Sequence, residues 1–150
     1  LEQFRAQWDG PLVIKGIQCV EDAQIAADLG VNGLALSNHG GRQLEGSPAP
    51  VALLPHVADA VGDRVELICD GGIRRGSDIV KAVALGATAA MGGRAYLYGL
   101  GAAGERGVDT AIGFLRTEYE RCLALNGITS TAHIHSGMVT PVGGRVATFT

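Results

Sequence analysis

The stretch VELICDGGIRRGSDIVKAVALG, residues 65–86, contains one complete β/α unit and decides the fold class of this chain. An apolar, β-rich run over 65–73 is followed by a helical pattern over 76–86. Ser77 or Asp78 can cap the first turn of that helix, and Gly86 stands where a left-handed residue closes one. A buried strand followed directly by a helix is typical of a parallel sheet.

The same pattern occurs 56 residues earlier in the chain, so the sequence contains an internal repeat. Other strand-like runs cover 11–17, 33–40 and 87–95, and other helical patterns cover 21–30, 50–62 and about 108–125. The repeating unit is therefore two β/α modules. The matching residues are Gly16, Ile17, Asp22, Ala26, Leu29 and Gly30 in the first copy, and Gly72, Ile73, Asp78, Ala82, Leu85 and Gly86 in the second.

Four β/α modules fit these 150 residues, whereas a closed (β/α)8 TIM barrel has eight and typically about 250 residues. We therefore predict an α/β fold that is half of such a barrel, over residues 1–150. Half a barrel would leave sheet edges unpaired. The segment LEQFRAQWDG, residues 1–10, resembles the end of a helix that follows a further strand, so we expect an upstream half to complete the fold as a separate segment.

Polar and glycine residues follow each of the four predicted strands. Because the carboxyl ends of barrel strands form one rim, these residues should meet at one mouth. Backbone N–H groups of segments 70–76 and 92–94 can bind an anion, with an arginine closing on it, which predicts a phosphate-bearing ligand. The rim residues are Lys15, then Ser37, His39 and Arg42, then Asp70, Gly72 and Arg74, then Gly93 and Arg94.

Composition and charge exclude several classes of protein. The chain is 47% hydrophobic with a formal net charge of −3, which gives no basic surface for nucleic acid or an anionic membrane. No apolar stretch reaches the roughly 18 residues that a membrane span needs, and no leader is seen. Three separated cysteines without CxxC spacing indicate neither disulfides nor zinc, and predict core thiols in a reducing cytoplasm. His133 and His135 lack a third ligand nearby, so we expect no metal.

Four motifs give the chain a resemblance to a known family. They are VIKG (13–16), LSNHGGRQL (36–44), DGGIRRGSDIVKAVALGA (70–87) and GGRAYLYGLGAAGERGV (92–108). In this order and spacing the chain resembles the C-terminal half, strands 5–8 with their helices, of the FMN-dependent 2-hydroxy-acid oxidases and dehydrogenases, which include glycolate, lactate and mandelate enzymes. The resemblance covers about residues 8–125.

The resemblance implies a role for each rim residue. Lys15 would lie beside N1 and O2 of the flavin, where a cation stabilises the anionic reduced ring, and Ser37 would contact the flavin. His39 would be the base that takes a proton from the substrate, and Arg42 would bind the substrate carboxylate. The residues that would hold the ribityl chain and phosphate of FMN are Asp70, Gly71, Gly72, Ile73, Arg74, Gly93 and Arg94.

The residues themselves agree with this chemistry, because oxidising a 2-hydroxy acid needs an anion clamp, a base with a near-neutral pKa and an electron acceptor. The family's two active-site tyrosines, and the aspartate that pairs with the histidine, would lie upstream. We therefore expect activity only with the upstream half present, in a homo-oligomer of the whole enzyme. The segment 93–108 resembles bacterial mandelate-type and lactate-type members of the family more than plant glycolate ones, and this resemblance implies a mandelate-like substrate.

Two alternatives stay open at this point. The chain could be a non-catalytic half-barrel that only assembles with a partner. It could instead belong to another phosphate-binding barrel such as the IMP dehydrogenase type, although Cys122 lies too far along the chain for the catalytic cysteine of that type. A dinucleotide site at GLGAAG, residues 99–104, is excluded because no second strand with an acidic end follows it.

Overall fold

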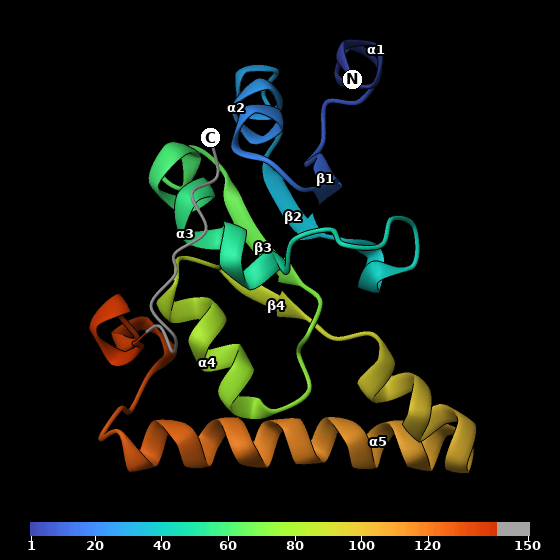
Figure 1. The fold of residues 1–150 in the computed structure, drawn as a ribbon, viewed down its shortest axis with the longest axis vertical. Coiled ribbons are helices and arrows are strands. Elements are labelled where there is room, and N and C mark those ends of the chain that lie inside the picture. Colours follow the sequence, from blue (N-terminus) through green and yellow to red (C-terminus); the bar gives the residue numbers. More distant parts are fainter. Residues whose placement is uncertain (141–150) are drawn as a thin grey trace.

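The computed structural model describes residues 1–140 of the chain (Figure 1). Strands and helices alternate through most of this length, as predicted. In chain order the elements are α1 (Glu2–Gln7), β1 (Val13–Ile17), α2 (Val20–Asp28), β2 (Gly33–Ser37), the 3-10 turn η1 (His39–Gly41), α3 (Pro50–Val61), β3 (Glu66–Asp70), α4 (Gly76–Ala84), β4 (Ala89–Met91), α5 (Arg94–Leu125), and the 3-10 turns η2 (Thr131–His133) and η3 (Ser136–Met138).

The four strands form one parallel sheet in the order β1-β2-β3-β4. Ser37, Asp70 and Met91 stand side by side at the carboxyl ends of three neighbouring strands. Each strand is joined to the next by a helix, which is the right size of crossover for parallel pairing. The chain is thus a run of β/α modules with sequential strand order, as in part of a TIM barrel.

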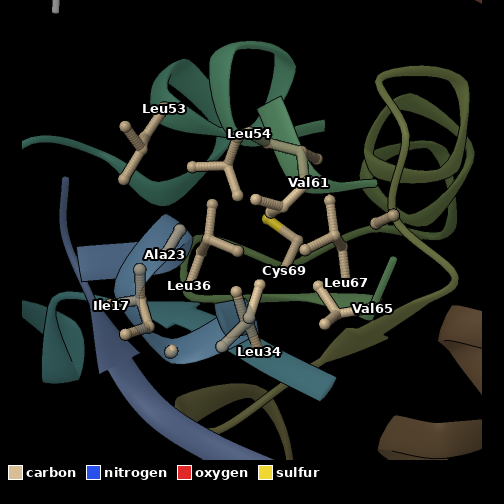
Figure 2. Close-up of a cluster of buried hydrophobic side chains, with 14 of the residues drawn as sticks. Ile17, Ala23, Leu34, Leu36, Leu53, Leu54, Val61, Val65, Leu67 and Cys69 are labelled. Atoms are coloured by element: carbon tan, nitrogen blue, oxygen red, sulfur yellow. The ribbon is translucent and has the colours of Figure 1, made fainter. Parts of the chain in front are cut away.

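The hydrophobic core lies between one face of the sheet and helices α2, α3 and α4 (Figure 2). Alternate residues of β2 and β3 point into it, so Leu34, Leu36, Leu67 and Cys69 are almost completely buried. Helix α3 supplies the opposing side chains, and burying each large aliphatic side chain contributes about 1.5–3 kcal/mol. The α3 residues in the cluster are Leu53, Leu54, Val57 and Val61.

The other face of the sheet is largely uncovered on β1, β3 and β4 within residues 1–140, although apolar strands of this kind predict cover on both faces; on β2 its residues, such as Ala35, are buried. Val13 is 50% exposed and Met91 is 41% exposed. The neighbouring Ile68 is half-buried and Ala89 is exposed. In a closed barrel this face is the interior and is filled by layers of inward side chains. The bare face is therefore what half of a barrel would present.

Helix α5 differs most from the expectation, because it begins at Arg94 rather than near residue 108. It contains a break at Ala103 and Gly104, where the backbone angles are not helical. The two parts pack together closely, since a Cβ on Gly99 would lie 2.4 Å from the carbonyl oxygen of Gly107. Gly99 and Gly107 therefore allow close contact between the two parts of the helix.

The helix ends are capped partly as predicted. Gly30 and Gly86 adopt left-handed backbone angles after α2 and α4. Asp78 caps α4 by accepting hydrogen bonds from the N–H groups of Arg74 and Arg75. None of the helices within residues 1–140 is long and apolar enough to cross a bilayer.

Candidate active site

The carboxyl ends of the four strands surround one cavity of about 400 Å³, a size typical of small-molecule sites. Every rim contributes to it, as the sequence predicts. All predicted site residues except Ser37 line it. The lining residues are Lys15, His39, Gly40, Arg42, Gln43, Asp70, Gly71, Gly72, Ile73, Arg74, Met91, Gly92, Gly93, Arg94, Ala95, Tyr96 and Leu97.

Ser37 is fully buried and lies behind the cavity. Its hydroxyl donates to Oδ2 of Asp70 at 2.6 Å, and it accepts from Lys15 Nζ at 3.2 Å and from the N–H of His39 at 3.1 Å. A serine hydroxyl has one donor and two acceptor sites, so all of its hydrogen-bonding capacity is used. Ser37 therefore joins three rims of the site.

Lys15 and Asp70 form an ion pair across this hydroxyl, with Nζ 2.8 Å from Oδ2. Partial burial raises the pKa of Asp70, but the hydrogen bonds from Lys15 and Ser37 and the positive charges of Lys15 and His39 outweigh it, so this pKa is lowered. Asp70 is therefore a carboxylate at neutral pH. Lys15 is held at a fixed place on the rim, unlike a charge that only solvates the end of a strand.

His39 is exposed at the start of η1, with a positive φ of 55° that is uncommon outside glycine. Its N–H is fixed by Ser37, and Asn38 holds the next turn by accepting from the N–H of Gly40 at 3.0 Å. The ring lies against Gly16 of β1, where a Cβ would be 2.9 Å from the imidazole Cε1. The two hydrogen bonds thus fix the backbone of the turn, and the contact with Gly16 limits where the imidazole can lie at the cavity.

Arg42 and Arg94, which come from two different rims, differ in their contacts. Arg94 donates from Nη2 to the carbonyl oxygen of Gly40 at 3.0 Å and so connects the fourth rim to the second. Arg42 follows η1 and is exposed, and its guanidinium has no partner among residues 1–140. Arg42 is therefore the cation of this loop that is available to an incoming anion.

The glycine-rich segment after β3 differs in part from the prediction that its N–H groups bind an anion. The N–H groups of Arg74 and Arg75 both donate to Asp78 Oδ2, and that of Gly76 donates to Glu118 Oε2. These three donors are already used. The N–H groups of Gly72 and Ile73 have no acceptor within the described part of the chain and remain available.

The cavity fits FMN on its own geometry. An added Cβ on Gly72 or Gly93 would meet nothing within 4 Å, so the backbone there leaves room for a bound group. Arg74 and Arg94 provide guanidinium groups next to these glycines, which suits one phosphate. Lys15 lies across the cavity on β1, where a cation can face a flavin ring.

Several lining residues were not predicted. Gln43 adjoins the predicted loop, and Met91, Tyr96 and Leu97 flank the fourth rim. Their place next to a rim motif was the only available signal. No group of three or more potential metal-ligating side chains occurs in the described residues.

Comparison with known proteins identifies the family of this chain. The profile of the family described as FMN-dependent dehydrogenase matches residues 1–141. The chain is 58% identical over 113 residues to pre-mycofactocin synthase of Mycolicibacterium smegmatis, covering 75% of this chain and 28% of that protein. It is 50% identical over 140 residues to a putative L-lactate dehydrogenase of Mycobacterium tuberculosis, covering 93% of this chain and 34% of that protein.

A solved structure shares the fold as well. A mandelate oxidase variant with a monooxide FMN adduct superposes with a TM-score of 0.85 at 42% identity, over 90% of this chain and 43% of that one. The chain thus spans about a third of the length of the two curated relatives. This family match rules out the alternative that the chain belongs to a barrel of the IMP dehydrogenase type.

Proposed function

Because this chain belongs to the family of FMN-dependent dehydrogenases, we propose that the protein containing it binds FMN and oxidises a 2-hydroxy acid to the 2-oxo acid. One observation carries the proposal. A single cavity is lined by His39 as the base, by the unpaired guanidinium of Arg42 and by the fixed Lys15. The reaction removes two electrons and two protons from the substrate. FMN, when bound, supplies the acceptor for the electrons.

Arg42 binds the substrate carboxylate in this proposal. Its guanidinium presents a planar set of donors that matches a carboxylate in a bidentate arrangement. It lies three residues after His39 on the same short loop. A substrate held by its carboxylate therefore has its α-carbon and hydroxyl near the imidazole, which reduces the entropic cost of reaching the reactive geometry.

His39 takes a proton from the bound substrate. Histidine suits this task because its ordinary pKa lies close to neutral pH. Asp70 and Ser37 belong to the hydrogen-bond network behind the ring, in which Ser37 accepts from the N–H of His39 and donates to Asp70. Lys15 would face the flavin, and its ion pair with Asp70 holds it in place.

The phosphate end of FMN is bound by the third and fourth rims. Asp70 and Gly71 face the ribityl chain, while the free N–H groups of Gly72 and Ile73 and the side chain of Arg74 face the phosphate. Gly93 and Arg94 complete this end of the cavity.

We further infer that an upstream segment completes the barrel and the active site. The uncovered face of the sheet and the one-third coverage of the curated relatives both support it. The strands of that segment would then also form the substrate side-chain pocket.

The substrate class has two candidates. The mandelate oxidase structure supports a mandelate-like 2-hydroxy acid, and the putative L-lactate dehydrogenase supports a smaller one.

The 58% identity to pre-mycofactocin synthase favours a second function, in which the protein acts as a synthase of that kind. A panel of lactate, mandelate and glycolate distinguishes them, because a synthase of that kind should reduce its flavin with none of the three.

The test uses the complete protein under anaerobic conditions. Cofactor released by heat should be FMN, and mixing with the right 2-hydroxy acid should bleach the flavin absorbance. His39→Ala should keep FMN bound, and its rate of bleaching should fall by about 10²–10⁴-fold. Arg42→Ala should mainly raise the substrate concentration that gives half of the maximal bleaching rate. Release of FAD or a nicotinamide would contradict the cofactor, and normal bleaching by His39→Ala would contradict the base.

A further inference from the structure

A carboxylate outside the cavity holds the loop between β3 and α4. Glu118 lies on α5, 42 positions after Gly76 in the sequence. Its Oε2 accepts a hydrogen bond from the N–H of Gly76 at 3.0 Å, and its Oε1 lies 3.0 Å from Nη1 of Arg75. Both oxygens of one side chain therefore bind two consecutive residues at the start of α4.

The backbones of the two helices also meet at this point. A Cβ on Gly76 would lie 2.0 Å from the backbone nitrogen of Tyr119 and 2.5 Å from the carbonyl oxygen of Leu115. Gly76 is buried, and the side chain of Glu118 is only 35% exposed. The first turn of α4 is thus fixed on α5 by contact as well as by charge.

These contacts decide which arginine of the Arg74–Arg75 pair faces the cavity. Arg75 is held by Glu118 on the α5 side, whereas Arg74 lines the cavity and its guanidinium has no partner within the described residues. The sequence predicts only that one of the two should face the ligand. The pairing across 43 positions makes Arg74 that residue.

The same contacts close the amino end of α4 to anions. The N–H groups of Arg74 and Arg75 are used by Asp78, and that of Gly76 by Glu118. Two carboxylates at this end would also repel a phosphate. An anion must therefore approach the loop from the cavity side, at Gly72, Ile73 and Arg74.

We propose that Glu118 is a positioning residue for the phosphate site: by holding Arg75 and Gly76 it fixes the loop so that Arg74 and the free N–H groups face the phosphate. This inference rests on the proposed function. The apparent dissociation constant rises by the factor by which the binding-competent loop becomes less populated. Losing a hydrogen bond to a charged group corresponds to a factor of about ten or more.

The experiment compares FMN with riboflavin, which lacks the phosphate. In the complete protein freed of its flavin, the dissociation constants of both are measured by quenching of flavin fluorescence. The wild type should bind FMN more tightly. Glu118→Ala should weaken FMN binding about tenfold and leave riboflavin binding unchanged. Glu118→Gln should lose less, because its amide oxygen can still accept from the N–H of Gly76.

The matched control is Glu120→Ala, two positions along the same helix. Glu120 pairs with Arg116 at 2.8 Å on an exposed face of α5, so its removal should change neither constant. Arg74→Ala should abolish the preference for FMN, and Arg75→Ala should keep most of it. The reverse order for these two arginines would overturn the inference.

The outcomes separate the inference from the function it rests on. A wild type that binds riboflavin as tightly as FMN would refute the phosphate site itself. A wild type that prefers FMN, with Glu118→Ala keeping that preference, would refute only the role of Glu118. Equal losses for both flavins in Glu118→Ala would show a general loss of folding, and would also refute that role.

Discussion

The imidazole of His39 lies against the backbone of Gly16, 23 positions earlier on β1. Gly16 is the extra residue of a bulge, because Lys15 pairs with Ala35 and Ile17 pairs with Leu36, the very next residue of β2. Its φ is +108°, and a Cβ there would lie 2.9 Å from the His39 Cε1. The bulge thus places Lys15 toward the network while leaving space for the imidazole.

Gly16→Ala is expected to displace the ring and lower the rate of flavin reduction about 100-fold, since a shift of about 1 Å can cost that much. The backbone strain at positive φ should also cost about 1–2 kcal/mol of stability. Gly30→Ala is the matched control, because its φ is +75° and an added Cβ would meet nothing within 4 Å. Rapid-mixing absorbance and urea denaturation measure the two effects. Equal reduction rates in the two variants would contradict the contact.

The fold could be predicted largely because β/α modules have local signals. The predicted strands 11–17 and 65–73 contain β1 and β3, and the predicted helix 50–62 matches α3 to one residue. The start of α5 could not be predicted, because glycine lowers helix propensity and nothing local shows that Gly99 and Gly107 meet in space. Contact between helices overrode the local preference.

The sequence could predict which residues meet at the site. It could not predict the hydrogen bonds and ion pairs between them. The rim rule brought Lys15, His39 and Arg42 to one cavity. The expectation of three core thiols held only for Cys69, since Cys19 and Cys122 are half-buried. The hydrogen-bond partners of buried groups depend on contacts between elements that are distant in the sequence. The periodicity of hydrophobic residues gives no information about such contacts.

Ser37→Ala is expected to destabilise the fold by about 1–3 kcal/mol, because the N–H of His39 would lose its acceptor and Asp70 one donor. Flavin reduction should slow as well, since the His39 loop would lose that anchor. Ser47→Ala is the control: its hydroxyl donates only to the nearby carbonyl oxygen of Leu44. Urea denaturation checks the stability, and an effect of Ser37→Ala no larger than that of the control would contradict the network.

The lowered pKa of Asp70 predicts how stability depends on pH. A carboxylate whose pKa is lower in the folded state stabilises the fold above its unfolded value, near 3.8, and this contribution is lost as pH falls through the folded pKa. The stability difference between wild type and Asp70→Asn should therefore be largest near pH 6 and shrink below about pH 4. Urea midpoints at several pH values measure it.

The control for this pH dependence is Asp28→Asn. Asp28 pairs with Arg64 at 2.6 Å on the surface, where its side chain is 70% exposed, and such pairs contribute about 0–1 kcal/mol. The difference in stability between Asp28→Asn and wild type should therefore be small at every pH. If the difference for Asp70→Asn stays constant down to pH 3, the ion pair with Lys15 does not stabilise the fold.

The last prediction concerns the uncovered face of the sheet. Val13 on β1 is 50% exposed, Met91 on β4 is 41% exposed and Ile68 on β3 is half-buried, so apolar groups lie open where a barrel interior would be. Strands β1 and β4 also have an unpaired edge each in the described sheet.

Expressed alone, residues 1–150 should be colourless, aggregated or molten, and should bind an apolar dye. Expressed with an upstream half-barrel segment, they should give a yellow, soluble and active protein. Size-exclusion chromatography, dye fluorescence and the visible spectrum make the comparison. A monomeric 150-residue chain that melts cooperatively and binds FMN would show that this half of the barrel is self-sufficient.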